Sequence, residues 1–384
     1  MCSLSSPKEF IYSLKFAPNG KVFASGAEDG IRLWDLAERK EIHHLLGKTT
    51  IAALAFSPDG KTLAGAGRDN RIHLCDVATG KELRNWEAET DLLCFSPDGK
   101  FIASSDSEII CVWASDSGKE VMRLHAGVSP FGLAFSPNGR ILVAAGLASR
   151  TKANGDRDDD SAIQCWDMRT GQMIREFNTQ QGLVYAVAFA PDGRTIASDG
   201  ANSTILLCDL TGHGNTKPAA PSAAELDKLW ADLASDAAKS HRALWTLALS
   251  PQQSVPFLTT RMCPSAAIDV KQFAGLWAGL ENDTFSIRSK AEKSLVELGE
   301  SAEAALQEKL RGNVSLEVRR RLEQILEKRR PDVLRQLRAI DTLEQIGNPE
   351  TREILATLVK GAANPRVSQA AEAALQRQGR NPSR

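Results

Sequence analysis

One pentapeptide recurs five times in the first half of this chain and constrains how that half can fold. Each copy reads Phe, Ser or Ala, Pro, Asp or Asn, and Gly. The copies are Phe16–Gly20, Phe56–Gly60, Phe95–Gly99, Phe135–Gly139 and Phe189–Gly193, spaced by 40, 39, 40 and 54 residues. Self-similarity at a period near 40 residues, in segments that read as strands, is typical of β-propeller blades.

Each copy of the pentapeptide ends one expected strand and begins a tight turn. Apolar alternation, as in Leu14 and Phe16 or in Leu54 and Phe56, predicts a β-strand. Proline presets φ at the first turn position, and glycine permits the positive φ that the turn needs. Two more strands follow, and a Thr-Gly or Ser-Gly turn then leads to a fourth. The fifth repeat ends near Gly212 with no obvious fourth strand.

The turn followed by a Trp-Asp strand end resembles the WD40 family over roughly residues 10–212. Cys75 and Cys208 replace tryptophan in two repeats, and no repeat keeps the family's Gly-His pair. The resemblance implies four-stranded blades that lack the full His-Ser-Asp-Trp hydrogen-bond set of the family. Three parts of that set are retained in the first repeat, namely Ser25, Asp29 and Trp34.

The number of blades leaves closure of the ring open. Propellers have about four to eight blades, and the resemblance implies a preference for seven. Either five blades close on themselves, with Cys2–Ser5 supplying the missing outer strand, or the chain is the remainder of a longer propeller that starts upstream. We favour the second interpretation, because the first repeat begins almost at Met1.

The fourth repeat carries an acidic insertion that includes Asp156–Asp160. Asp156, Asp158 and Asp160 alternate as the ligands of a calcium loop do. Ser161, however, stands where an EF-hand needs glycine, and no helices flank the loop. We interpret the insertion as a solvated acidic loop, with a calcium site as the alternative.

The second half of the chain has a helical pattern. We expect a propeller over residues 1–212, a Gly- and Pro-rich linker over 213–222 and an α-helical domain over 223–384. Ser222 and Glu225 form a capping box that predicts the first helix. The remaining patterns predict helices at about 253–262, 270–281, 284–298, 301–311, 315–329, 332–346, 350–360 and 365–378, most of them bounded by Gly or Pro.

Paired short amphipathic helices with glycine stops are typical of an α-solenoid or a related bundle. The region Asn282–Lys328 resembles HEAT-like repeats, through Arg288–Ala291, Leu298-Gly299 and Glu317–Arg319. A propeller, a Pro/Ala linker and a helical tail in this order are similar to large bacterial WD40 proteins. That resemblance implies an interaction role and no enzymatic activity.

Composition indicates an ordinary globular protein. The chain has 42% hydrophobic residues, 25% charged residues and a net charge of −1, so general nucleic-acid binding is not expected. The seven cysteines form no C-x-x-C pair or disulfide framework, which suggests a reducing compartment. With no signal peptide and no apolar stretch long enough to span a membrane, we predict a cytoplasmic protein with no membrane contact.

No catalytic or cofactor motif is present. The six histidines form no metal-binding pattern, and no nucleophile elbow, Walker A loop or dinucleotide-binding loop occurs. We therefore expect no enzyme activity, no metal and no cofactor. Four aspartates recur at equivalent blade positions and are interpreted as structural: Asp35, Asp76, Asp167 and Asp209.

The most distinctive charged segment is Lys309–Arg338, with ten Lys or Arg residues against four Asp or Glu. Its default interpretation is a solvated face with intrahelical ion pairs such as Glu317 with Arg321. Contact with an acidic protein is the alternative, and nucleic-acid phosphates are disfavoured because aromatic residues are not interleaved. The candidate contact residues are Arg320, Arg321, Arg329 and Arg330.

These features predict a non-catalytic protein–protein interaction scaffold with two surfaces, the propeller loops and the helical repeats. Linking two binding surfaces in one chain raises the effective concentration of the second contact. The alternative function is a regulatory or sensor module of a bacterial signalling or transcription-control enzyme. The identity of the protein partner and the oligomeric state are left open.

Overall fold

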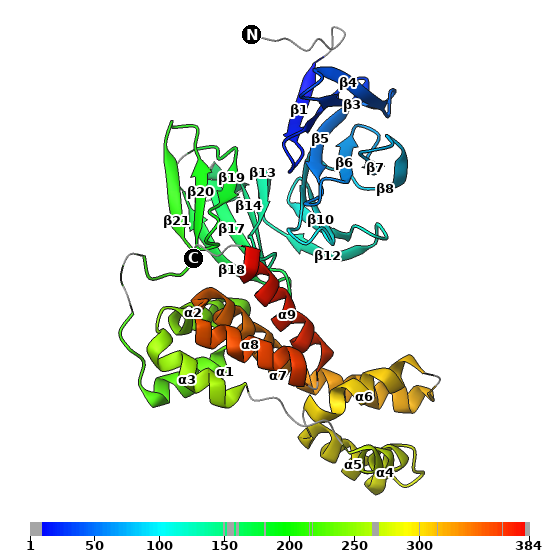
Figure 1. The fold of residues 1–384 in the computed structure, drawn as a ribbon, viewed down its shortest axis with the longest axis vertical. Coiled ribbons are helices and arrows are strands. Elements are labelled where there is room, and N and C mark those ends of the chain that lie inside the picture. Colours follow the sequence, from blue (N-terminus) through cyan, green and yellow to red (C-terminus); the bar gives the residue numbers. More distant parts are fainter. Residues whose placement is uncertain are drawn as a thin grey trace. The chain divides into compact units, whose positions relative to one another are not determined.

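The computed structural model describes residues 10–148, 150–151, 157–158, 161–179, 182–214, 216, 218–262, 269–298, 300–312, 314–362 and 364–380. The chain divides into two compact units, Met1–Leu210 and Thr211–Arg384. The N-terminal unit is built of strands and the C-terminal unit of helices (Figure 1).

The described residues of the N-terminal unit form five antiparallel sheets of three or four strands in sequence order (Figure 1), which we call blades one to five, and one small two-stranded ribbon. Blade one is β1 (Ile11–Phe16), β2 (Val22–Ala27), β3 (Gly30–Asp35) and β4 (Lys40–Leu45). Blade two is β5 (Ile51–Phe56), β6 (Thr62–Gly67), β7 (Arg71–Asp76) and β8 (Glu82–Glu87). Blade three is β9 (Leu92–Phe95), β10 (Phe101–Asp106), β11 (Ile109–Ala114) and β12 (Glu120–His125).

Blade four is β13 (Val128–Phe135), β14 (Ile141–Ala148), β17 (Ser161–Asp167) and β18 (Met173–Asn178). The small ribbon β15 (Arg150–Thr151) and β16 (Arg157–Asp158) lies within the acidic insertion. Most of Asp156–Asp160 falls outside the described residues, so the calcium alternative stays untested there. Blade five is β19 (Val187–Phe189), β20 (Thr195–Asp199) and β21 (Ile205–Asp209), with three strands among the described residues. Cys2–Ser5 also lie outside those residues.

The recurring pentapeptide forms the turn between the first two strands of each blade, as its residues predict. Its glycines have φ between 66° and 73°, a region open to glycine but strained for other residues. In blade two the Ser57 hydroxyl donates to Asp59 Oδ1 at 2.6 Å and accepts from Thr62 N at 2.9 Å. The Ser57 hydroxyl in turn holds the pKa of Asp59 below its ordinary value. The serine, the aspartate and the glycine of the motif therefore each have a role in the turn.

Neighbouring blades pack through two different faces. We call the face of a blade that points toward the next blade in the sequence its trailing face, and the opposite face its leading face. In blade one, Ile31 and Leu33 lie on the trailing face and alternate along β3 with Arg32 and Trp34 on the leading face. Ile31 and Leu33 form one buried cluster with Leu54 and Leu63, which lie on the leading face of blade two. The fit is close, because a Cβ atom at Gly65 would lie 2.6 Å from Ile31 Cδ1. Blade one thus presses its trailing face onto the leading face of blade two.

The same packing recurs along the unit. Ile72 and Leu74 of blade two pack with residues of blade three, and Ile110 and Val112 of blade three pack with residues of blade four. The first strands of consecutive blades lie beside one another throughout, from β1 to β19. The core of the N-terminal unit is therefore a series of blade-to-blade junctions.

Two cysteines at these junctions, the buried Cys75 and the half-buried Cys94, give a chemical test of the packing. Burial raises the pKa of Cys75 and of Cys94 to about 12, whereas an unperturbed thiol has a pKa of about 8.5. Because the thiolate is the reactive form, we expect both thiols to alkylate about a thousandfold more slowly than in the unfolded chain at pH 8. Peptide mass spectrometry after iodoacetamide treatment measures this, with the chain in denaturant as the control. Equal rates in the two conditions would contradict the packing.

Among the described residues, nine helices form the C-terminal unit. They are α1 (Ala223–Asp232), α2 (Ala237–Ala248), α3 (Pro251–Arg261), α4 (Val270–Leu280), α5 (Phe285–Glu297), α6 (Glu300–Arg311), α7 (Leu316–Ile346), α8 (Pro349–Gly361) and α9 (Pro365–Arg380). The capping box of Ser222 and Glu225 is present at the start of α1, as predicted.

One helix prediction was wrong. The patterns predicted two helices, 315–329 and 332–346, separated at Pro331, but α7 runs through that proline without a break. Proline removes one backbone hydrogen bond, to the carbonyl of residue 327. Pro331 and Glu327 are both exposed, so water can solvate that carbonyl. Buried residues on both sides of the proline then hold the helix in one piece.

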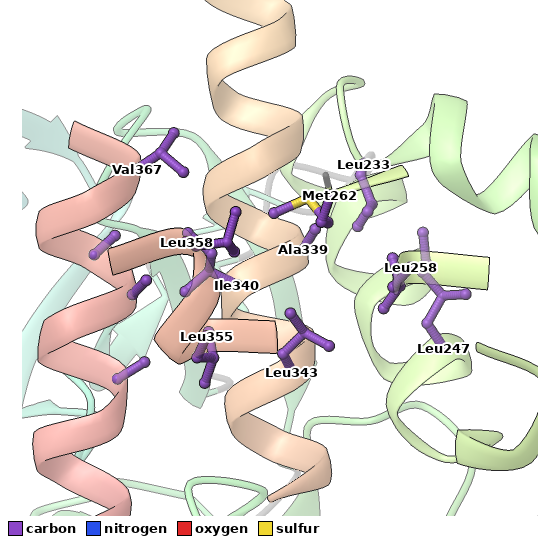
Figure 2. Close-up of a cluster of buried hydrophobic side chains, with 14 of the residues drawn as sticks. Leu233, Leu247, Leu258, Met262, Ala339, Ile340, Leu343, Leu355, Leu358 and Val367 are labelled. Carbon is purple, nitrogen blue, oxygen red and sulfur yellow. The ribbon is translucent and has the colours of Figure 1, made fainter. Parts of the chain in front are cut away.

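The helical unit has two hydrophobic clusters that share α7. One cluster joins α1, α2 and α3 with α8, α9 and the second half of α7 (Figure 2). The other joins α4, α5 and α6 with the first half of α7, through Val318, Leu322 and Ile325. In a solenoid each repeat contacts only its neighbours, whereas α7 contacts α2, α3, α5, α6, α8 and α9. The unit is therefore a bundle centred on α7.

Candidate interaction surfaces

An exposed set of inner-strand residues is the first candidate surface. The residue four positions before the pentapeptide phenylalanine is Tyr12, Ala52, Asp91, Phe131 or Tyr185 in blades one to five. We call these five residues the rim set, because each lies on or just before the first strand of its blade, away from the pentapeptide turn. The three aromatic members, in blades one, four and five, are exposed.

Local backbone geometry explains the exposure of the rim set. Pairing of the first two strands shifts register at Tyr12, Ala52 and Phe131, so each is the extra residue of a β-bulge. A bulge removes its residue from the ladder and re-aims the side chain. In blade five, the Asp199 carboxylate accepts from the backbone N–H groups of Tyr185 and Ala186, at 3.0 and 2.6 Å. The Phe131 and Tyr185 rings lie 6.1 Å apart, so they form one apolar contact point.

Buried polar groups inside the blades have structural roles. Trp34 Nε1 donates to Ser25 Oγ at 2.9 Å, and Trp113 Nε1 donates to Ser104 Oγ at 2.8 Å. Asp29 forms an ion pair with Arg32, on the third strand of its own blade. Arg32 is thus a cationic partner for Asp29 in blade one, and the sequence pattern did not reveal this pair.

Blade two has an equivalent polar arrangement around His73. Both of its ring nitrogens lie 2.8 Å from a carboxylate oxygen, one of Asp69 and one of Glu82. Burial opposes ionisation of Glu82, but hydrogen bonds from His73 and Asn85 prevail and hold the pKa of Glu82 below its ordinary value. Because His73 is equivalent to Arg32 of blade one, we interpret this arrangement as part of the blade and not as a catalytic site.

Three of the four recurring aspartates close the turn between the third and fourth strands, as expected for a structural role. The Asp35, Asp76 and Asp167 carboxylates accept from backbone N–H groups two or three residues later, at 2.7 to 2.8 Å. Throughout the ranges that the structure describes, no group of three or more His, Cys, Asp or Glu side chains could hold a metal ion. No described helix is long and apolar enough to cross a membrane.

The basic segment of α7 is the second candidate surface. In the structure, its predicted contact residues differ in how far their side chains are exposed. Arg329 is only 4% exposed, because it follows Ile325 by four residues on the buried side of the helix. Its side chain is therefore not available to a partner, and its prediction as a contact residue was wrong. Arg320 and Arg330 are exposed.

Ion pairs hold two further basic side chains of this segment, Arg321 and Lys328. Arg321 pairs with Glu317 at 3.1 Å, as predicted, and also with Glu292 of α5 at 3.2 Å. Lys328 pairs with Glu292 at 2.8 Å, so one carboxylate joins two cations across the helix pair. Because α5 lies beyond the local sequence, intrahelical spacing could not reveal Glu292. Arg320, Lys328 and Arg330 are exposed around the side of α7 away from the buried Arg329, and we call these three residues the basic strip of α7.

The blades match profiles of known repeat families. The profile described as "WD domain, G-beta repeat" matches residues 1–35, 90–114 and 171–209. The profile "Anaphase-promoting complex subunit 4 WD40 domain" matches residues 46–94. The sheets and these matches define the N-terminal unit as an array of WD40 repeats. The chain is a WD40-repeat β-propeller protein with a C-terminal helical region.

Curated relatives share parts of this array. A serine-threonine kinase receptor-associated protein of Gallus gallus is 22% identical over 50% of this chain and 64% of its own length. An Autophagy-related protein 16 of Arabidopsis thaliana is 23% identical over 48% and 35% of the two chains. An uncharacterized WD repeat-containing protein of Synechocystis sp. is 31% identical over 37% and 39%. The chain thus spans less than two thirds of each of these relatives.

Among solved structures, the β-propeller domain of Myceliophteria thermophila Cps50 (Swd1) aligns with 56% of this chain and 69% of its own. The TM-score is 0.46 and the sequence identity is 18%.

Proposed function

We propose that this protein is a non-catalytic scaffold that binds another protein through the rim set of its blades. The observation that carries the proposal is the exposed pair of Phe131 and Tyr185, held at bulged or hydrogen-bonded positions of neighbouring blades. Aromatic side chains on a rigid support lose little conformational entropy on binding and dominate many protein interfaces. The rim set therefore has the chemistry of a protein contact.

The helical unit supplies the second surface of the proposed scaffold. The basic strip suits an acidic protein segment, because exposed cations steer and orient a partner of opposite charge. Helices α5 and α6 with the first half of α7 correspond to the segment that resembles HEAT-like repeats, and we propose that this subset contributes the surface. Two contacts in one chain would strengthen binding through effective concentration. The five free thiols on strands support a reducing compartment such as the cytoplasm.

Affinity capture of the tagged full chain from its native cell extract tests this proposal. A stoichiometric protein partner is expected, and the double variant Phe131→Ala/Tyr185→Ala should weaken its retention by about tenfold or more. Val121→Ala is the matched control, since Val121 is an exposed apolar residue on the outer strand of blade three. Unchanged retention by the rim variant would contradict the role of the rim set, and catalytic turnover by the purified chain would contradict a scaffold.

The basic strip is tested in the same assay. Arg320→Glu/Arg330→Glu reverses two exposed charges without touching the Glu292 pairs. An acidic partner should then be retained more weakly at low salt, and its retention should fall less steeply as salt rises, because the variant has less attraction for salt to screen. Identical salt dependence in the variant and the wild type would remove the second surface from the proposal.

A further inference from the structure

The two ends of the blade array expose apolar faces that the interior of the array buries. At one end, Leu14 on the leading face of blade one is 58% exposed, and Phe16 beside it is also exposed. At the other end, Ile205 and Leu207 on the trailing face of blade five are 74% and 71% exposed. Packing of blade five onto blade one within the same chain would bury these side chains. The five described blades therefore do not close on themselves.

Equivalent positions inside the array are buried or half-buried. Leu54 is the blade-two equivalent of Leu14 and is 1% exposed, and the equivalents in blades three to five, Leu93, Leu133 and Val187, are half-buried. The equivalents of Ile205 and Leu207 in blades one to four are all buried, namely Ile31, Leu33, Ile72, Leu74, Ile110, Val112, Ile163 and Cys165. The exposure at the two ends thus reflects that no described blade packs there, and not a different residue type.

The two free faces are the two halves of one contact. Wherever a described hydrophobic cluster spans two blades, a trailing face packs on a leading face. The free leading face of blade one offers Leu14, Phe16 and Phe23, with the Phe16 and Phe23 rings 5.8 Å apart. The free trailing face of blade five offers branched aliphatic side chains at the positions that fill such a face elsewhere. Each chain therefore presents both partners of a junction that it already forms internally.

We propose that these faces join separate copies of this chain head to tail, the trailing face of blade five packing on the leading face of blade one of a second copy. The contact is heterologous, because the two surfaces that meet are different. Such contacts form rings where the rotation closes and open arrays where it does not. Burial of large exposed apolar faces drives the association.

Sedimentation velocity on the purified full chain tests this proposal with a complementation design. The wild-type chain should show an average mass that rises with concentration above the 41.6 kDa of one chain. Leu14→Lys and Leu207→Lys each block one face and should each remain at the mass of one chain. Because both side chains are exposed in the single chain, thermal unfolding should confirm that each variant is folded.

An equimolar mixture of the two variants distinguishes a head-to-tail contact from any other association. The Leu14→Lys chain keeps an intact trailing face and the Leu207→Lys chain keeps an intact leading face, so one heterologous contact can form. The mixture should stop at two chains, since the remaining free faces carry lysine on both sides. Leu83→Lys, at an exposed position of β8, is the matched control and should associate as the wild type does.

Three results would overturn the proposal. They are a wild-type chain that stays at the mass of one chain at every concentration, variants that associate as well as Leu83→Lys, and a mixture that fails to form the two-chain species. A single-chain wild type bound to a different protein over these faces would show that another molecule occupies them.

Discussion

Replacing Leu54 with alanine should lower the free energy of unfolding of the N-terminal unit by about 2 to 5 kcal/mol. Leu54 lies on the leading face of blade two and packs in one cluster with Ile31 and Leu33 of blade one. Removing its side chain deletes buried apolar contacts and leaves a cavity between the blades. Urea unfolding of the full chain, followed at the transition of the strand unit, measures the loss.

Leu14→Ala is the matched control for Leu54→Ala. The two leucines occupy equivalent positions of consecutive blades, but Leu14 has no described blade against its side chain. In dilute solution its replacement should change the free energy of unfolding by no more than about 0.5 kcal/mol, as for most surface positions. Equal losses from the two variants would show that blade one is covered in the same way as blade two.

Replacing Arg377 with alanine should destabilise the helical unit by about 3 to 5 kcal/mol, because it leaves a buried carboxylate without its counter-ion. Arg377 of α9 donates two hydrogen bonds to the Glu344 carboxylate of α7, both of 2.7 Å. The Glu344 side chain is only 4% exposed. Circular dichroism during urea unfolding of the full chain measures the helical transition.

A double variant separates the buried charge from the packing of α9. Glu344→Met/Arg377→Met removes both charges and keeps side chains of similar length, so it should be clearly more stable than Arg377→Ala. If the double variant is as unstable as Arg377→Ala, the loss reflects packing of Arg377 and not an unpaired Glu344. The pair of variants therefore assigns the energy to its cause.

The sequence predicted the blades well because each blade is specified locally. The turn needs proline, a carboxylate or amide and glycine within five residues, and the strands have period-two patterns. These local requirements are visible at each copy of the motif, and the turns and strands occur where they were predicted. The capping box at Ser222 was predicted for the same reason.

Features that depend on distant residues could not be predicted. Pro331 indicated a helix end, but packing of α7 on both sides of it prevailed over the local preference. Arg329 was read as a surface cation because the buried side of α7 is defined by helices elsewhere in the chain. The partner of Asp29 and the second partner of Arg321 likewise became visible only when Arg32 and Glu292 were placed beside them.

The rim set could be predicted from the sequence in its positions but not in its exposure. Its residues can be found by counting four positions back from each pentapeptide phenylalanine, but the exposure of Tyr12 and Phe131 follows from bulges that the sequence pattern does not display. In a regular strand, the side chains of Tyr12 and Phe131 would have the directions of ordinary ladder residues. The register shift at these positions is what makes them candidates for binding.

Hydroxyl-radical footprinting of the full chain in dilute solution tests most directly how the blades are joined. The method reports the exposure of individual side chains, and equivalent residues of different blades provide internal comparison. We predict fast modification of Leu14, Ile205 and Leu207 and strong protection of Leu54, Ile31 and Leu33. Similar modification of Ile31 and Ile205, or of Leu54 and Leu14, would contradict the packing of trailing faces on leading faces.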